Sequence, residues 1–353
     1  MFLCFTISPF YSNTGLTKVP YAERAFESDE GREGYVETTQ GAWGAKTARP
    51  PAAANAGRSA RKTARWKEEL TAYAFLGPSL LLFVAFVFYP MAQSIYLSLH
   101  VTDPRGRIAE FVGFANFAEL FASPLFYSGL RATGQFISYT VPTTIVLGLL
   151  LAMLTHRALP GMRWFRFVFS LPVAMSVGTA AVIWLLLFHP SVGMLNYFLG
   201  ELGLAPIFWL SDPKWAMISV SILTVWMNLG FVYIVLLGGL NGIPDDIFDS
   251  LSVDGAGPLR KYGQVVLPLL SPSLFFITIV SLIGAFQAFG QFHILTKGGP
   301  MNMTNVVVYQ IYQDAFVNFR FGAGSAQALV LFAIVLALTV VQFAVVEKKV
   351  HYQ

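Results

Sequence analysis

Six apolar stretches, each long enough to cross a lipid bilayer as a helix, constrain this chain more than any other feature. A bilayer core about 30 Å thick needs about 20 apolar residues per helix. The predicted spans cover residues 71–98, 132–155, 167–188, 216–240, 268–290 and 325–346. Over the whole chain, hydrophobic residues make up 55% and charged residues only 12%, which leaves too little polar surface for a soluble domain. The sequence predicts an all-α membrane protein with six transmembrane helices.

Basic residues are divided unevenly between the two sets of loops that flank these spans. One set carries Arg58, Arg61, Lys62, Arg65, Lys67, Arg157, Arg163, Arg166, Arg260, Lys261, Lys348 and Lys349. The other set carries Arg105, Arg107, Arg131, Lys214, Lys297 and Arg320. Because cytoplasmic loops hold the excess of Lys and Arg, this asymmetry predicts that both termini are cytoplasmic.

Composition also divides the chain into segments. Residues 1–57 have almost no apolar periodicity and are predicted to be a disordered tail without a signal peptide. Residues 58–70 form a basic juxtamembrane segment, 71–346 the transmembrane domain, and 347–353 a short cytoplasmic tail.

The loop at residues 241–267 interrupts the apolar pattern with charge, glycine and proline. Pro244 is placed to occupy a first helical position, and Ile247, Phe248 and Leu251 follow at a spacing that gives one apolar face. Gly255 can end that helix because glycine tolerates positive φ. Such an amphipathic helix fits a groove on a cytosolic partner or lies along the membrane surface as a connector.

A second short helix is expected to follow this turn. Gly257-Pro258 restarts the helix, "LRKYGQVVL" carries basic residues, and Pro268 is predicted to open the fifth span. Two short helices with a bend between them would form a stiff lever.

The same stretch, "DSLSVDGAGPLRKYGQVVLPLL", resembles the cytoplasmic motif of the membrane subunits of binding-protein-dependent ATP-binding-cassette (ABC) importers. Asp249, Gly255, Val265, Leu267 and Pro268 fall at the motif positions, whereas Ser250 and Leu251 replace its two alanines. The resemblance implies a type I importer permease fold and docking of this loop into an ATPase. It assigns coupling to Asp249, Ser250, Leu251, Asp254, Gly255, Ala256, Leu267 and Pro268.

From about Leu70 onward the chain resembles the carbohydrate-uptake branch of these importers, through "ILTKGGPMNMT" and "FWLSDPKWA". The family implies a second permease subunit, two cytosolic ATPase subunits and an external substrate-binding protein, with no nucleic acid involved. The ending "VVQFAVVEKKVHYQ" most resembles the first permease of glycerol-3-phosphate systems. The absence of Lys and Arg from the middle of the predicted spans favours a neutral sugar, because a dianion needs cationic partners.

Polar groups inside the spans mark candidates for a substrate path. These are Trp226, Asn228, Tyr233, Ser281, Gln287 and Gln291, which combine aromatic faces with amides and hydroxyls. The resemblance places sugar contacts of the maltose-type subunit in the same two spans. Hydrogen bonding between helices without ligand contact is the alternative role for this set.

Two other classes of membrane protein are less compatible with the sequence. An ion-coupled secondary transporter needs acidic groups within the membrane, yet Asp and Glu lie in the loops. No phosphate loop or H-E-x-x-H motif occurs, and the five histidines and single cysteine have no metal-ligand spacing. We therefore expect a non-catalytic permease subunit in the cell membrane, without a cofactor or metal.

Overall fold

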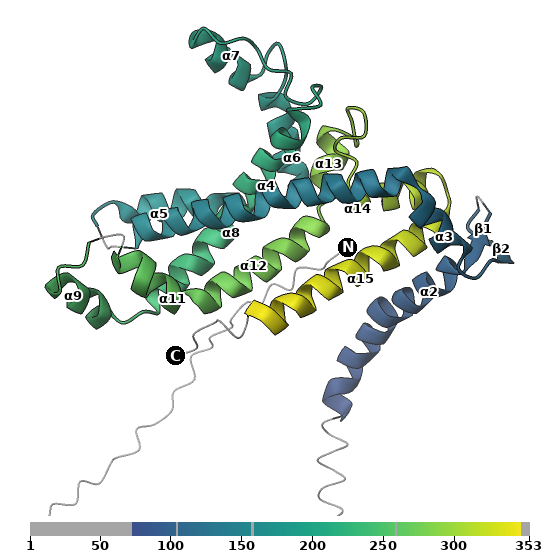
Figure 1. Cartoon of the computed structure of the whole chain (residues 1–353), viewed down its shortest axis with the longest axis horizontal. Helices are drawn as coiled ribbons and strands as arrows, with labels where there is room; N and C mark the ends of the chain where they lie inside the picture. The colour runs from purple at the N-terminus through teal and green to yellow at the C-terminus, as the bar shows by residue number, and fades with distance from the viewer. Residues whose placement is uncertain (1–72, 104, 157–158, 258–259, 347–353) are drawn as a thin grey trace, which may run out of the picture. The chain divides into compact units, whose positions relative to one another are not determined.

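The computed structural model describes residues 73–103, 105–156, 159–257 and 260–346, which form a set of helices and one two-stranded sheet (Figure 1). In chain order the elements are η1 (Val84–Phe88), α2 (Tyr89–Ser98), β1 (His100–Thr102), β2 (Ile108–Phe111), α3 (Ala115–Ala122), α4 (Pro124–Thr155), α5 (Met162–Ser170), η2 (Leu171–Ala174), α6 (Val177–Leu187), α7 (Met194–Glu201), α8 (Ala216–Asn241), α9 (Asp245–Val253), η3 (Lys261–Val266), α11 (Leu267–Leu269), α12 (Ser271–Phe286), α13 (Gly290–Leu295), α14 (Val307–Tyr312), η4 (Gln313–Val317) and α15 (Phe321–Val346).

Five helices in the described residues are long and apolar enough to cross a membrane. They are Tyr73–Ser98, Pro124–Thr155, Ala216–Asn241, Ser271–Leu295 and Phe321–Ala344. A sixth crossing is available when the bent pair Met162–Ala174 and Val177–Leu187 counts as one span, which agrees with the predicted number. The second and sixth helices begin earlier than predicted, at Pro124 and Phe321 instead of at 132 and 325.

The third span is not the single helix predicted at 167–188. Its two halves meet at an angle of 105°, because Met175 and Ser176 adopt extended backbone with ψ of 140° and 150°. Pro172 lacks an N–H for the helical ladder, and the Ser176 hydroxyl accepts a hydrogen bond from Thr179 N that starts α6 anew. The chain therefore changes direction inside its third apolar segment.

The packing between α4 and α8 depends on close approach of the helices. A Cβ on Gly148 of α4 would lie 2.6 Å from Val232 Cγ1 of α8, so only glycine fits there. Gly230, on another part of α8, faces backbone atoms of Ser170 and Val173 in the third segment. Small residues of this kind allow membrane helices to approach each other closely.

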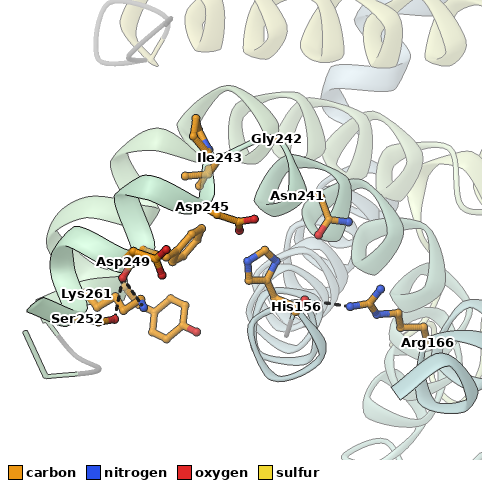
Figure 2. Close-up of a pocket in the computed structure, with 12 residues that line it drawn as sticks. His156, Arg166, Asn241, Gly242, Ile243, Asp245, Asp249, Ser252 and Lys261 are labelled. Carbon is orange, nitrogen blue, oxygen red and sulfur yellow. Dashed lines mark hydrogen bonds between the residues drawn. The ribbon is translucent and has the colours of Figure 1, made fainter. Parts of the chain in front are cut away.

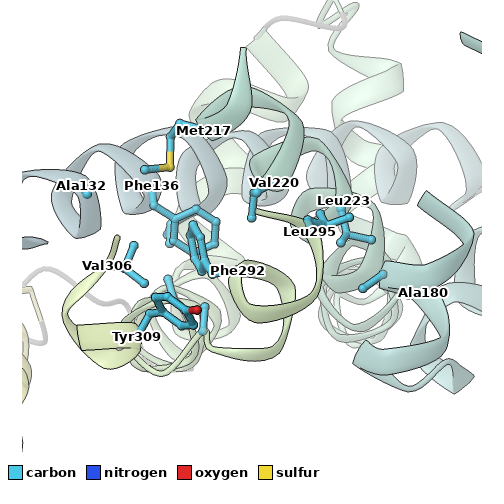
Figure 3. Close-up of a cluster of buried hydrophobic side chains, with 14 residues drawn as sticks. Ala132, Phe136, Ala180, Met217, Val220, Leu223, Phe292, Leu295, Val306 and Tyr309 are labelled. Atoms are coloured by element: carbon cyan, nitrogen blue, oxygen red, sulfur yellow. The ribbon is translucent and has the colours of Figure 1, made fainter. Parts of the chain in front are cut away.

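The main buried cluster joins α4, α8, α13 and α14 (Figure 3). The rings of Phe136 and Phe292 meet edge on in it, with their centroids 4.8 Å apart. Tyr309 lies in the same cluster. Its burial raises the pKa of its hydroxyl above the usual value, and the nearby Tyr312 raises it further.

The first span is exposed along its apolar length. No residue in its most apolar window is buried, and α2 meets the rest of the domain chiefly at α15. The β1–β2 hairpin follows directly (Figure 1), where Asn116 of α3 donates hydrogen bonds to Ser98 O and His100 O. This hairpin is the only sheet in the described residues, so the all-α prediction holds for every span.

Candidate coupling helix and substrate path

The loop after α8 forms the predicted short helix, α9. It begins at Asp245, one residue later than predicted, because the ψ of 138° at Pro244 makes that residue the N-cap instead of the first helical residue. Asp245 and Asp246 occupy the first turn, where carboxylates complement the positive end of the helix dipole.

The predicted glycine turn ends α9. Gly255 has a φ of +68°, and Ala256 N bonds to Leu251 O at 3.0 Å while Gly255 N bonds to Ser252 O at 3.3 Å. A Cβ at Gly255 would meet no atom within 4 Å. Backbone conformation alone therefore requires glycine at this position.

The two faces of α9 differ as the apolar pattern predicts. Phe248 is buried, and Ile247 and Leu251 are half-buried. The remaining predicted coupling residues of this helix and turn are exposed or half-buried, namely Asp249, Ser250, Asp254, Gly255 and Ala256. Val253 is the most exposed apolar residue here, at 87%. The outer face of α9 is therefore free to meet a partner.

Phe248 is held from two sides by residues that the sequence analysis did not connect with it. Lys261, only 8% exposed, places its Nζ 3.3 Å from Phe248 O and 5.0 Å from the centroid of the Phe248 ring. The His156 ring, just beyond α4, lies 5.0 Å from the same ring. Lysine and histidine without a motif give no sequence signal for such a contact.

A cleft of about 680 Å³ lies beside α9 and opens toward the ends of α4 and α8 (Figure 2). Its lining residues are His156, Arg166, Asn241, Gly242, Ile243, Pro244, Asp245, Phe248, Asp249, Ser252, Lys261 and Tyr262. The guanidinium of Arg166 donates to Thr155 O and His156 O, the last carbonyls of α4. These bonds cap α4 and fix one wall of the cleft.

The second helix of the loop ends before the membrane span begins. Helical backbone runs through η3 and α11 and breaks at Leu270, so α12 starts at Ser271. Pro268 therefore lies inside the connecting segment and does not open the fifth span as predicted. Both Pro268 and Pro272 lack the N–H that would continue the helix. Leu267 and Pro268 are half-buried.

The six predicted substrate-path residues do not form one cluster. Trp226 packs against Trp184, with ring centroids 5.8 Å apart, in a mainly apolar groove of about 730 Å³ between α4, α6 and α8. Asn228 is exposed and lies two residues further on, roughly 200° around the helix. Tyr233 is 1% exposed, and its hydroxyl is 2.8 Å from Thr155 Oγ1. The structure thus gives Tyr233 a role in packing.

The other three residues lie within the fifth span, Ser271–Leu295. Ser281 is half-buried within α12, Gln287 is the exposed C-cap of that helix, and Gln291 is buried in α13. An aromatic cluster that the sequence analysis did not predict lies around Gln291 in the sequence and includes a residue of α14. Phe289 stacks on His293 at 5.2 Å and contacts Tyr312 at 4.9 Å. Within the described residues, no group of three or more His, Cys, Asp or Glu side chains is arranged to hold a metal ion.

Several apolar spans and a short helix projecting between the fourth and fifth define a membrane permease. The chain belongs to the family of binding-protein-dependent transport system inner membrane components, whose model matches residues 136–352. It is a multi-pass permease of the ABC importer class. No comparison supports the ion-coupled alternative.

Curated relatives cover nearly the whole domain. The chain is 36% identical over 283 residues to the sn-glycerol-3-phosphate transport system permease protein UgpA of Agrobacterium fabrum, covering 79% of this chain and 96% of the relative. It is 35% identical over 286 residues to UgpA of Pectobacterium atrosepticum, covering 80% and 95%.

Solved structures confirm the type I fold. A bacterial ABC transporter that imports the acidic polysaccharide alginate matches with a TM-score of 0.72 at 21% identity, over 82% of this chain and 99% of that chain. A bacterial alginate ABC transporter in complex with its alginate pentasaccharide-bound periplasmic protein matches with a TM-score of 0.71 at 21% identity, over 78% and 93%.

Proposed function

We propose that this chain is the non-catalytic permease subunit of an importer for sn-glycerol-3-phosphate, and that α9 couples it to ATP hydrolysis on partner subunits. The observation that carries the coupling is α9 itself, a short helix with an anchored apolar face and an exposed polar face, ended by Gly255 at positive φ. The names of the relatives support the substrate.

The partners follow from this class of protein. A second permease subunit would complete the pathway, two ATPase subunits would bind α9 and its counterpart, and an external protein would deliver substrate. The uneven distribution of Lys and Arg supports a cytoplasmic position for α9 and both termini.

The contacts around Phe248 provide a route for movement. An ATPase that displaces α9 would move Phe248, which touches His156 after α4 and Lys261 before the fifth span. Thr155 and Tyr233 then connect the end of α4 to α8. A push on one short helix would therefore reach three membrane helices.

The substrate path runs past Trp226, Asn228, Ser281, Gln287 and Gln291 in this proposal. At separate points along this path their amides and hydroxyls can bind the hydroxyls of a polyol, and the Trp226 indole can cover its apolar side where the path passes the groove between α4, α6 and α8. A neutral sugar is the second candidate substrate. The described helices favour it because Arg131 is exposed near the beginning of α4 and Arg166 is committed to backbone carbonyls.

Uptake of labelled substrate into cells with and without this chain tests the proposal. A deficit in sn-glycerol-3-phosphate uptake that the chain restores supports it. A deficit confined to neutral sugars would replace the substrate and keep the coupling role, whereas unchanged uptake of both classes would refute the importer assignment for these solutes.

A further inference from the structure

Helix α5 carries an exposed patch that the transport mechanism does not use. Arg163, Trp164 and Phe167 surround a hollow of about 320 Å³. Trp164 is 72% exposed, and its ring meets the Phe167 ring edge on at 6.0 Å. Arg163 has no hydrogen bond or ion pair with the part of the chain that the structure describes.

The depth of this patch in the membrane follows from the contacts on either side of it. Arg166 holds the last carbonyls of α4, so the beginning of α5 lies level with the end of that span. At the other end of α5, the Phe169 ring lies 5.9 Å from the Tyr233 ring, and the Tyr233 hydroxyl also contacts Thr155 at the end of α4. Because α5 leads from there into the apolar third segment, Phe167 lies about 6 Å further along the helix toward that segment than Arg163 does.

We propose that Arg163, Trp164 and Phe167 bind an acidic phospholipid. The free guanidinium suits a phosphate group at the level of the headgroups, and the two rings below it suit the first part of an acyl chain, as aromatic residues do at membrane interfaces. A net negative headgroup is favoured because Arg163 is the one charged residue that lines the hollow and it has no ion-pair partner among the described residues. The proposed cytoplasmic orientation of the termini decides only which leaflet of the membrane this lipid belongs to.

Retained lipid in the purified importer complex gives a first test. The complex is extracted from membranes that contain phosphatidylglycerol, and the lipid that stays bound is counted by native mass spectrometry. Arg163→Gln should lower phosphatidylglycerol retention about fivefold. Arg260→Gln is the matched control, because Arg260 is also exposed near the α9 end of the protein. Equal retention by Arg163→Gln and the control would refute the site.

Fluorescence quenching gives a second test that does not depend on lipid surviving extraction. The complex is placed in phosphatidylcholine bilayers containing brominated phosphatidylglycerol or brominated phosphatidylcholine, and the Trp164 signal is taken as the difference from Trp164→Phe. Stronger quenching by phosphatidylglycerol supports the proposal. Equal quenching would show general lipid contact, and no quenching would show that protein covers the patch; either result overturns it. Neither test needs substrate or ATP, so both are independent of the transport assignment.

Discussion

Lys261 Nζ lies 3.3 Å from the backbone oxygen of Phe248 and 5.0 Å from the centroid of its ring. The buried ammonium of Lys261 thus joins the two short helices of the loop. Lys261 and Phe248 are thirteen residues apart in the sequence, and the Gly255 turn lies between them. Burial of a charge is costly, and here a carbonyl and an aromatic face offset that cost. The loop is therefore a connected unit, not two independent helices.

Removing this charge should uncouple the loop while leaving the protein folded. Lys261→Met keeps the apolar stem and removes the ammonium. We expect ATP hydrolysis stimulated by loaded binding protein to fall about tenfold, because the hydrogen bond and the cation–π contact together are worth roughly 1.5 kcal/mol. Arg260→Met is the exposed neighbouring control. Wild-type stimulation in Lys261→Met would show that the contact does not transmit movement.

Truncating Phe248 should have a larger effect. Phe248→Ala removes the ring that both Lys261 and His156 contact, and burial of such a ring stabilises packing by about 3 kcal/mol. We expect the permease to remain in the membrane but the ATPase subunits to be lost on purification. The control is Val192→Ala, an exposed apolar residue outside α9. Full recovery of ATPase with Phe248→Ala would contradict the anchoring role.

Two glycines separated by one residue offer a matched test of the turn. A Cβ would meet no atom within 4 Å at Gly255 or at Gly257, yet only Gly255 has positive φ. Gly255→Val should therefore abolish uptake, since a side chain at positive φ costs about 1–2 kcal/mol and more when β-branched. Gly257→Val should retain most uptake. Similar uptake by the two variants, measured at equal membrane levels, would argue against a conformational requirement.

The contact between α4 and α8 predicts a compensating pair. Gly148→Ala should lower thermal stability by about 1–3 kcal/mol because its Cβ would overlap Val232. Adding Val232→Ala should restore part of the loss. Gly134→Ala on the same helix meets no atom within 4 Å and should be neutral. Thermal unfolding of the purified complex measures these three variants and the Val232→Ala single variant, and additive losses in the double variant would rule out direct contact.

Asn228 and Tyr233 separate a binding role from a packing role. Asn228→Ala should raise the substrate concentration needed for half-maximal uptake and leave stability unchanged, because its side chain is exposed. Tyr233→Phe should lower stability by about 1 kcal/mol, since it removes the hydroxyl that bonds Thr155, without changing apparent affinity. If Tyr233→Phe changed the apparent affinity and Asn228→Ala did not, the substrate path would lie on the Tyr233 side of α8 instead.

The sequence predicts features that depend on local signals and misses those that depend on packing. Apolar length indicated the spans, and Asp254-Gly255 indicated the turn, because each is encoded by neighbouring residues. Proline did not indicate the break in the third span. Pro142 lies inside the continuous helix α4, whereas Pro172 precedes a sharp bend, and the difference lies in what packs around each.

The candidate site shows the same limit. Trp226 and Asn228 are close in sequence but lie on different faces of α8, so one lines a groove and the other does not. The contact of Lys261 with Phe248 depends on how the Gly255 turn folds the loop back. Neither arrangement has a pattern in the sequence.

The bend in the third segment also makes this span depend on a neighbouring helix. At about 1.5 Å per residue, Met162–Ala174 extends about 20 Å and Val177–Leu187 about 16 Å, so neither half alone crosses a hydrocarbon core of about 30 Å. Gly230 of α8 receives the backbone of Ser170 just before the bend. The third segment can therefore cross the hydrocarbon core only with both halves together, and its bent form depends on α8, which packs against the backbone at the bend.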